Sequence, residues 1–235
     1  MSRITFVLAT MLSFMAFRPV AAQDWNKGVD AYQAGDYATA LQEWRPLAEQ
    51  GDGDAQYFLA LMYDNGRGVP QDYAKAIKWY RLAADQGYAN AQYNLGVTYK
   101  NGEGVPQDYA EAIKWYRLAA EQGNVSAQYN LGLMYRNGQG VPQDYAEAVK
   151  WFRLSAKQGD AQAQNDLAVR YEYGQGVLQD NVMAHMWYNL AAANGTEKSG
   201  EWRDEIANKM SPAAIETAQA MARECMSSGY TKCGY

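Results

Sequence analysis

The chain has few of the residues that enzymes commonly use to hold metals or to activate nucleophiles. It contains one histidine, His185, and two cysteines, Cys225 and Cys233. A zinc site needs a set of three or four such ligands, and a Ser/His/Asp or Cys/His arrangement would have to use His185. This histidine stands where the related segments described below have Ile or Val, so we expect it to pack inside the fold. The sequence therefore predicts no catalytic residues, no metal site and no cofactor.

An excess of positive charge is also absent. The chain has 21 Lys and Arg residues against 26 Asp and Glu residues, for a formal net charge of −5. Binding to nucleic acid requires clustered Lys and Arg that neutralise phosphates. We therefore expect no nucleic-acid partner.

Long hydrophobic runs are missing except at the start of the chain. Residues 1–22, "MSRITFVLATMLSFMAFRPVAA", place Arg3 before an apolar run that is followed by small residues. This order is typical of a secretory signal peptide, and the run is too short to cross a bilayer comfortably. We predict cleavage near Ala22-Gln23, no membrane span in the mature chain, and a periplasmic or secreted location.

The two cysteines fit export. Both lie within the last eleven residues, and their spacing is not that of a CxxC motif. In an oxidising compartment such a pair favours a disulfide, Cys225–Cys233, that would pin the tail to the end of the last helix. A redox or metal-binding pair is the alternative, and the sequence places no histidine nearby to support it.

Internal repetition is the most prominent feature that the chain does have. The segment "NGEGVPQDYAEAIKWYRLAAEQGN" at 101–124 returns almost unchanged at 65–88 and 137–160, with a fainter copy at 173–196. Equivalent residues are 36 positions apart. A fixed period of this length indicates supersecondary units that stack on one another, because one small unit cannot bury its own apolar face.

Each unit is predicted to contain two helices. In the third unit, "AQYNLGLMYRNG" at 127–138 has the spacing of an amphipathic helix and ends at Asn-Gly, which suits a C-cap. The second helix should begin after Asp144, whose position relative to Glu147 is that of a capping box. The stripe expected to be buried on this helix consists of Ala146, Val149, Trp151 or Phe152, and Ala156.

The repeated pattern A-Q-Y-N-L-G-x-x-Y-x-N-G-x-G-V-P-Q-D-Y-A-x-A-x-K-W-Y resembles the Sel-one-like (Sel1-like) repeat, a relative of the tetratricopeptide repeat with a longer internal loop. The resemblance covers residues 55–195, and residues 25–54 are similar to a shorter tetratricopeptide unit. It implies an all-α, right-handed α/α solenoid that binds proteins on a concave face lined by the first helices.

This interpretation gives the following organisation. Residues 1–22 form the signal peptide, 23–54 the tetratricopeptide-like hairpin, and 55–90, 91–126, 127–162 and 163–196 the four Sel-one-like repeats. Residues 197–228 form C-terminal capping helices, with Ser211 as N-cap and Pro212 at the first helical position, and 229–235 form a tail. The cap is expected to cover the apolar face of the last hairpin.

The candidate binding residues are first-helix positions that the pattern predicts to be exposed. They form one column of mostly tyrosine and one column of charged residues: Tyr57, Tyr93, Tyr129, Asn165, Asp64, Lys100, Arg136 and Glu172. Tyrosine is a good recognition residue because it is large, stiff and able to hydrogen-bond. Two alternatives remain open: the tyrosines are half-buried between repeats, and the charges merely solvate a face.

The leading hypothesis is a non-catalytic exported scaffold that binds another protein or a peptide segment, with envelope regulation or assembly as its candidate roles. The alternative is a protein that binds or hydrolyses β-lactams or cell-wall ligands, as implied by a likeness to the Helicobacter cysteine-rich group. That group carries a cysteine pair in each repeat, whereas the repeats here have none and the chain lacks a Ser-x-x-Lys motif. A third hypothesis is a secreted factor that meets a host receptor.

Overall fold

The computed structural model describes residues 24–233, and this part of the chain is helical and contains no strand. The predicted signal peptide lies outside the described residues. The helices are α1 (Trp25–Gln33), α2 (Tyr37–Glu49), α3 (Gly53–Asn65), α4 (Tyr73–Asp85), α5 (Ala89–Asn101), α6 (Tyr109–Glu121), α7 (Val125–Asn137), α8 (Tyr145–Ala156), α9 (Ala161–Tyr173), α10 (Asn181–Ala193), α11 (Glu197–Ala207) and α12 (Pro212–Ser227).

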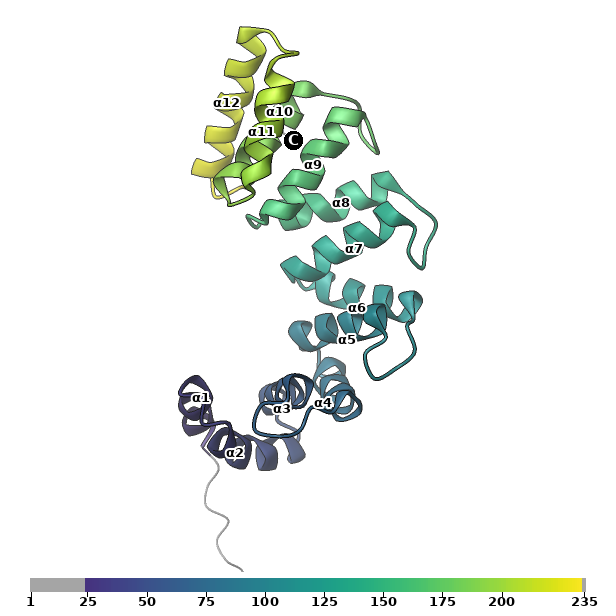
Figure 1. Ribbon diagram of the computed structural model, residues 1–235, viewed down its shortest axis with the longest axis vertical. Helices are drawn as coiled ribbons and strands as arrows, with labels where there is room; N and C mark the ends of the chain where they lie inside the picture. Colours follow the sequence, from purple (N-terminus) through teal and green to yellow (C-terminus); the bar gives the residue numbers. More distant parts are fainter. Residues whose placement is uncertain (1–23, 234–235) are drawn as a thin grey trace, which may run out of the picture.

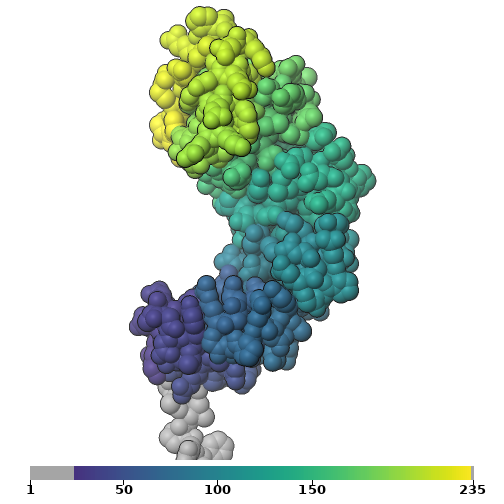
Figure 2. All heavy atoms as spheres, in the orientation of Figure 1, coloured from purple at the N-terminus to yellow at the C-terminus, as the bar shows by residue number. Residues whose placement is uncertain are grey.

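The helical hairpins stack one after another into a curved array (Figure 1). The first helices α3, α5, α7 and α9 alternate with the second helices α4, α6, α8 and α10, and each helix packs on the helices before and after it. Figure 2 shows that the array is bowed, with a hollow between its two ends. In the lower part of Figure 1, α1 and α3 face this hollow and α2 lies on the far side of them. The α-solenoid predicted from the repeats is confirmed.

The predicted capping box of the second helices forms only in part. In the second repeat, the Asp108 carboxylate accepts from the backbone N–H of Glu111 at 3.0 Å, as expected of an N-cap. The backbone N–H of Asp108, however, donates to the carbonyl of Tyr99 on the preceding helix at 2.9 Å. Because this donor is already satisfied, the Glu111 carboxylate instead pairs with Lys114 at 3.3 Å. The third repeat has the same arrangement.

One first helix lacks a side-chain cap, as its sequence indicates. Asp52, Asn124 and Asp160 cap α3, α7 and α9, whereas Tyr88 makes no capping hydrogen bond to α5. The Tyr88 ring instead fills the space over Gly53, where a Cβ would overlap it. Tyr88 therefore provides a packing contact between hairpins but no N-cap for α5.

The buried stripe of the second helices differs at one position from the predicted one. Ala146 is exposed, and Ala148, fully buried, takes its place beside Val149 and Phe152. Since α8 begins at Tyr145, residues 148 and 152 lie four apart on the inward face. A Cβ at Gly132 on α7 would lie only 2.6 Å from the Phe152 ring, so glycine permits this close approach.

A ladder of amides explains the glutamine that recurs in every repeat. The buried glutamines of the first helices each donate to a carbonyl eight residues earlier: Gln56 to Ala48, Gln92 to Ala84, Gln128 to Ala120, and Gln164 to Ala156. Each glutamine oxygen then accepts from an amide at the end of the second helix in the same repeat: Gln86, Gln122, Gln158 or Asn194. The ladder satisfies buried polar groups that would otherwise destabilise the hairpin junctions.

Arginines join three second helices, α4, α6 and α8, to the next first helix. The guanidinium groups donate to tyrosine hydroxyls at 2.5–2.6 Å in the pairs Arg81–Tyr99, Arg117–Tyr135 and Arg153–Tyr171. The tryptophan column of the second helices is buried or half-buried at Trp79, Trp115, Trp151 and Trp187. The recurring aromatic residues therefore contribute to packing between repeats.

The C-terminal end closes the array with α11 and α12. Ser211 accepts a capping hydrogen bond from the backbone N–H of Ala214 at 3.2 Å, with Pro212 at the first helical position, as predicted. Helix α12 packs against α10. Cys225 and Cys233 form a disulfide and are both fully buried, so the segment after α12 is tied back to it.

Among the helices of residues 24–233, none combines the length and the apolar character that crossing a membrane requires.

Candidate functional site

The predicted tyrosine column lies on the first helices, but its rings are half-buried instead of fully exposed. The ring centroid of Tyr93 lies 5.8 Å from that of Tyr116, and Tyr129 has the same separation from Phe152. Each ring therefore leans on the second helix of its own hairpin. Burial raises the pKa of Tyr57 and of Tyr129, so both hydroxyls stay protonated at neutral pH. One side of each ring therefore packs against the second helix, and the other side is partly accessible.

The fourth member of this column is partly covered by the cap. The side-chain oxygen of Asn165 accepts from the Ser199 hydroxyl of α11 at 2.8 Å. Asn165 is half-buried as a result. The accessible part of the column therefore ends near Tyr129.

The acidic residues at the two ends of the charged column have the same kind of partner. The Tyr80 hydroxyl donates to Asp64 at 3.1 Å, and the Tyr188 hydroxyl donates to Glu172 at 2.8 Å. Both donors are buried tyrosines of the second helix in the same hairpin. Burial raises the pKa of Asp64, and the hydrogen bond from Tyr80 opposes this change. These carboxylates are therefore anchored to the fold.

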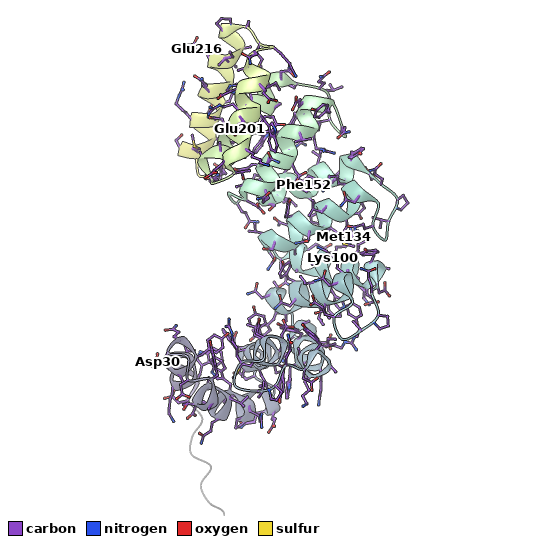
Figure 3. The ribbon with its side chains drawn as sticks, viewed as in Figure 1. Asp30, Lys100, Met134, Phe152, Glu201 and Glu216 are labelled. Atoms are coloured by element: carbon purple, nitrogen blue, oxygen red, sulfur yellow. A yellow bond between two sulfur atoms is a disulfide. The ribbon has the colours of Figure 1, made fainter. Side chains whose placement is uncertain are left out.

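The two cations in the middle of the charged column reach across to the next first helix. The Lys100 ammonium donates to the side-chain oxygen of Asn130 at 3.2 Å, whereas Arg136 forms an ion pair with Asp166. Asn130 is neutral, so its contact does not balance the charge of Lys100. Lys100 lies near the middle of the array (Figure 3). We call Tyr57, Tyr93, Tyr129, Asp64, Lys100, Arg136 and the neighbouring Asn130 the first-helix strip.

Two buried charged residues of α9 were not among the sequence candidates. Asp166 is 6% exposed and accepts from the Tyr129 hydroxyl at 3.2 Å in addition to its pair with Arg136. Arg170 is 8% exposed, lies 5.2 Å from the ring centroid of Tyr145, and has its pKa lowered by burial. The available signal was a departure from the repeat: Arg170 stands where the other units have Met or Thr.

His185 is a core residue. It is 2% exposed, and its Nδ1 atom has no hydrogen-bond partner among the described residues. Burial lowers the pKa of this imidazole, with a smaller effect in the same direction from Arg203. Within residues 24–233, no group of three or more His, Cys, Asp or Glu side chains is placed to hold a metal ion.

The described surface of the first helices carries several groups that can contact a partner. Half-exposed rings, tyrosine hydroxyls and an ammonium group follow one another along adjacent first helices. The Tyr93 and Tyr129 rings and the Lys100 ammonium each contact a neighbouring side chain. Such pre-organised side chains lower the entropic cost of binding.

Comparisons with known proteins agree with this architecture. The Sel1 repeat family model matches residues 53–88, 89–124, 125–160 and 161–196. Among solved structures, c5321, described as a protective antigen of uropathogenic Escherichia coli strains, is 43% identical, with a TM-score of 0.72. That match covers 73% of this chain but only 38% of c5321, so this chain spans well under half of that protein.

A Sel1 repeat protein from Oxalobacter formigenes is 32% identical with a TM-score of 0.71, and the match covers 88% of this chain and 78% of that one. No curated protein matches the chain. Sel1 repeats form scaffolds that typically bind other proteins. On the four matched repeats and these structural likenesses, the chain belongs to the Sel1 repeat family.

Proposed function

We propose that this protein is a non-catalytic exported scaffold that binds a segment of another protein along its first-helix strip. The observation that carries the proposal is the alignment of Tyr57, Tyr93 and Tyr129 at one register on successive helices. Tyrosine and arginine dominate binding energy in protein interfaces because they combine a large contact area with hydrogen bonding. A strip that repeats at each hairpin suits an extended polypeptide better than a compact small molecule.

The charges of the strip favour one orientation of the partner. Arg136 is already paired with Asp166, whereas the contact of Lys100 with Asn130 leaves its charge uncompensated. A carboxylate on the partner would therefore bind most favourably at Lys100, which lies on the same helix as Tyr93. Charge complementarity of this kind contributes mainly to specificity and association rate.

We further propose that the protein acts in the periplasm or outside the cell, in envelope regulation or assembly. The buried Cys225–Cys233 disulfide supports an oxidising compartment. The apolar run and the small residues of the first 22 positions support secretion. The similar protein c5321 is described as a protective antigen. Sequencing the N-terminus of the purified protein tests this part, and we expect it to begin near Gln23.

Site-specific photo-crosslinking tests the binding surface. A photo-reactive phenylalanine analogue replaces Tyr93 in one variant and Glu216 of the cap, which is exposed, in a matched control (Figure 3). After irradiation in cells, we expect a discrete adduct from position 93 and none from position 216. Adding Lys100→Glu and Tyr129→Ala to the position-93 variant should remove most of that adduct, with the helical circular dichroism unchanged.

Two results would contradict the proposal. Adducts that form at Glu216 but not at Tyr93 would move the binding surface away from the first helices. Hydrolysis of nitrocefin by the purified protein, abolished by a point change that leaves the fold intact, would show that the protein is an enzyme.

A further inference from the structure

The second helices carry leucines that the stacking of repeats does not cover. Leu82, Leu118 and Leu154 stand 36 residues apart on α4, α6 and α8 and are 40%, 39% and 45% exposed. Most other large apolar residues of these helices are buried. A recurring exposed apolar position marks a surface that a further element can cover. We call these three residues the leucine ridge.

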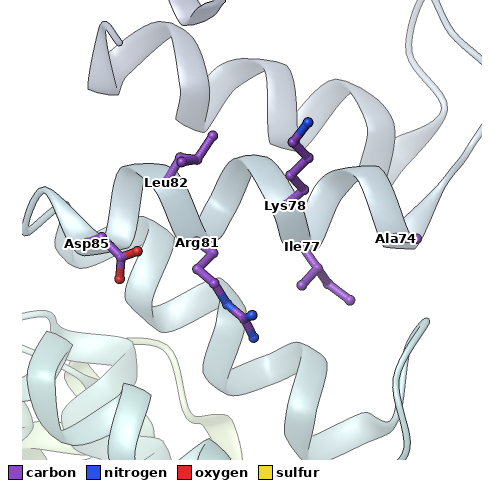
Figure 4. Close-up of a pocket in the computed structure, with 6 residues that line it drawn as sticks. All are labelled: Ala74, Ile77, Lys78, Arg81, Leu82 and Asp85. Atoms are coloured by element: carbon purple, nitrogen blue, oxygen red, sulfur yellow. The ribbon is translucent and has the colours of Figure 1, made fainter.

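Hollows accompany this register on two neighbouring second helices. One hollow, of about 370 Å³, lies on α4 and is lined by Ala74, Ile77, Lys78, Arg81, Leu82 and Asp85. Another, of about 290 Å³, lies on α2 and is lined by Ala38, Leu41, Gln42, Arg45 and Pro46, each 36 positions before a residue of the first set. Figure 4 shows that Lys78 and Leu82 lie on one side of α4, and Ile77 and Arg81 on the other. The same register therefore carries a hollow on both α2 and α4.

The last repeat shows what fits this register. On α10 the residues equivalent to Lys78 and Leu82 are Met186 and Leu190, and both are fully buried. Helix α11 packs on α10 much as each first helix packs on the second helix before it, whereas α12 is an additional neighbour. We therefore attribute the burial of Met186 and Leu190 to α12. The chain itself places an α-helix on this face.

The face that α12 buries consists mainly of small residues, with the half-buried Met221 beside them. Ala218, Ala222 and Cys225 are fully buried, whereas Glu216 and Glu224 are exposed on its flanks. Small side chains allow the backbone of a helix to approach protruding side chains such as leucine closely. A helix of this type is thus complementary to a leucine that projects from a shallow hollow.

The charges around the leucine ridge indicate which charged residues a partner helix would carry beside its apolar stripe. In a chain of net charge −5, helices α4 and α8 carry more Lys and Arg than Asp and Glu. Lys78 and Arg81 line the hollow on α4 together with a single carboxylate, Asp85, so its charged groups sum to +1. The covered face on α10 has Met186 and Asn189 at these two positions, so it carries no such charge. An outside helix with acidic flanks would gain attraction that α12 does not need.

We propose that the hollow on α4 is a second docking surface, which binds an amphipathic α-helix of a partner protein with a stripe of small apolar residues and acidic flanks. It lies on the second helices, apart from the first-helix strip, and does not depend on the function proposed above. The packing of α12 on α10 inside this chain is the precedent for this docking mode.

A labelled peptide tests the proposal directly. The probe is a synthetic peptide of residues 211–228 with Cys225→Ser and Arg223→Glu, so that it keeps the α12 face and gains acidic flanks. Its fluorescence anisotropy is measured as the purified protein is added. We expect saturable binding, weakened at least about tenfold by Leu82→Glu and less strongly by Lys78→Glu.

Controls separate docking from general apolar binding. Leu178→Glu changes a leucine that is 91% exposed in the loop between α9 and α10, and should leave the affinity unchanged. A peptide with Glu216→Lys and Glu224→Lys should bind more weakly than the acidic probe. Circular dichroism should show the same helix content for each protein variant.

Three results would overturn the proposal. The first is no saturable binding, and the second is binding that Leu82→Glu leaves unchanged, which would place the peptide elsewhere, for example in exchange with the chain's own α12. The third is sedimentation showing self-association that Leu82→Glu abolishes, because a second copy would then occupy this face. Equal affinity for acidic and basic peptides would overturn the acidic assignment.

Discussion

The middle of the array and its C-terminal end are built from the same type of hairpin, but the outward-facing residues of the second helix differ between them. In α4, α6 and α8 the outward register holds Lys, Arg and an exposed Leu, whereas α10 holds Met186, Asn189 and the buried Leu190. The inward packing hardly changes: Tyr80, Tyr116, Phe152 and Tyr188 are all fully or nearly fully buried. The fourth repeat therefore keeps the same core, whereas Met186 and Leu190 of its outer face are buried.

The polar network differs as well. Between the second and third repeats, Lys100 reaches a neutral Asn130, whereas between the third and fourth repeats Arg136 and the Tyr129 hydroxyl converge on the buried Asp166. A buried charge that is paired at several atoms fixes one arrangement of its neighbours. The arrangement of the third and fourth repeats is therefore more strongly specified than that of the second and third repeats.

The largest effect on stability is expected from replacing the buried Leu190, compared with the exposed Leu154 at the same register. Leu190→Ala should lower the free energy of unfolding by about 2–5 kcal/mol, since it leaves a cavity beneath α12. Leu154→Ala, at the same register on α8, should change it by only about 0.5 kcal/mol. Urea unfolding followed by circular dichroism measures both. Equal effects would mean that α12 does not cover this register.

The disulfide should matter only to the end that contains it. Cys225→Ser with Cys233→Ser should destabilise the protein by about 2–3 kcal/mol, because the cross-link restricts the unfolded tail. Hydrogen exchange should speed up in α12 and leave α3–α6 unchanged. Faster exchange throughout the chain would show that the cap stabilises the whole array.

The junction between the two regions depends on an N-cap. The Asp160 carboxylate accepts from the backbone N–H of Gln162 and Ala163 and from the Ser155 hydroxyl. Asp160→Ala should therefore cost about 1 kcal/mol. Tyr88→Ala, at the uncapped junction, removes packing over Gly53 but no capping bond. Thermal unfolding of both variants measures the comparison, and an unaffected Asp160 variant would contradict it.

The smallest effect should appear as a pH dependence. Burial lowers the pKa of His185 in the folded state below its ordinary value of 6.5. Below about pH 6.5 the imidazole is protonated in the unfolded chain but stays neutral in the folded chain. The free energy of unfolding therefore decreases as the pH is lowered, until the pH reaches the pKa of the folded state. His185→Ile, which restores the residue of the middle repeats, should flatten this part of the profile. A profile unchanged by the substitution would rule out His185 as its source.

Much of the fold could be predicted because the period and the caps are local signals. The spacing of 36 residues, the capping aspartates and the missing cap at Tyr88 all follow from the order of residues along the chain. The capping box was only partly right, because the Asp108 N–H is satisfied by the carbonyl of Tyr99. The stripe that named Ala146 was wrong by two residues, because burial depends on where the helix begins.

The candidate site was harder to predict. The register of Tyr93 and Lys100 was readable, but the depth of the ring against Tyr116 and the contact of Lys100 with Asn130 were not. Both depend on how far one hairpin is rotated against the next. Asp166 and Arg170 were missed because their partners come from other helices.

The sequence by itself determined the repeating hairpin, its capped ends and the inward aromatic residues, since these depend on contacts between residues close in the chain. The tertiary structure alone decided which outward residues meet another helix. Leu82 and Leu190 occupy the same place in their repeats, yet Leu82 is exposed and Leu190 is fully buried, a difference that we attribute to the packing of α12 on α10. Burial depends on which other elements pack against a residue, and the position of the residue in its repeat does not specify those elements.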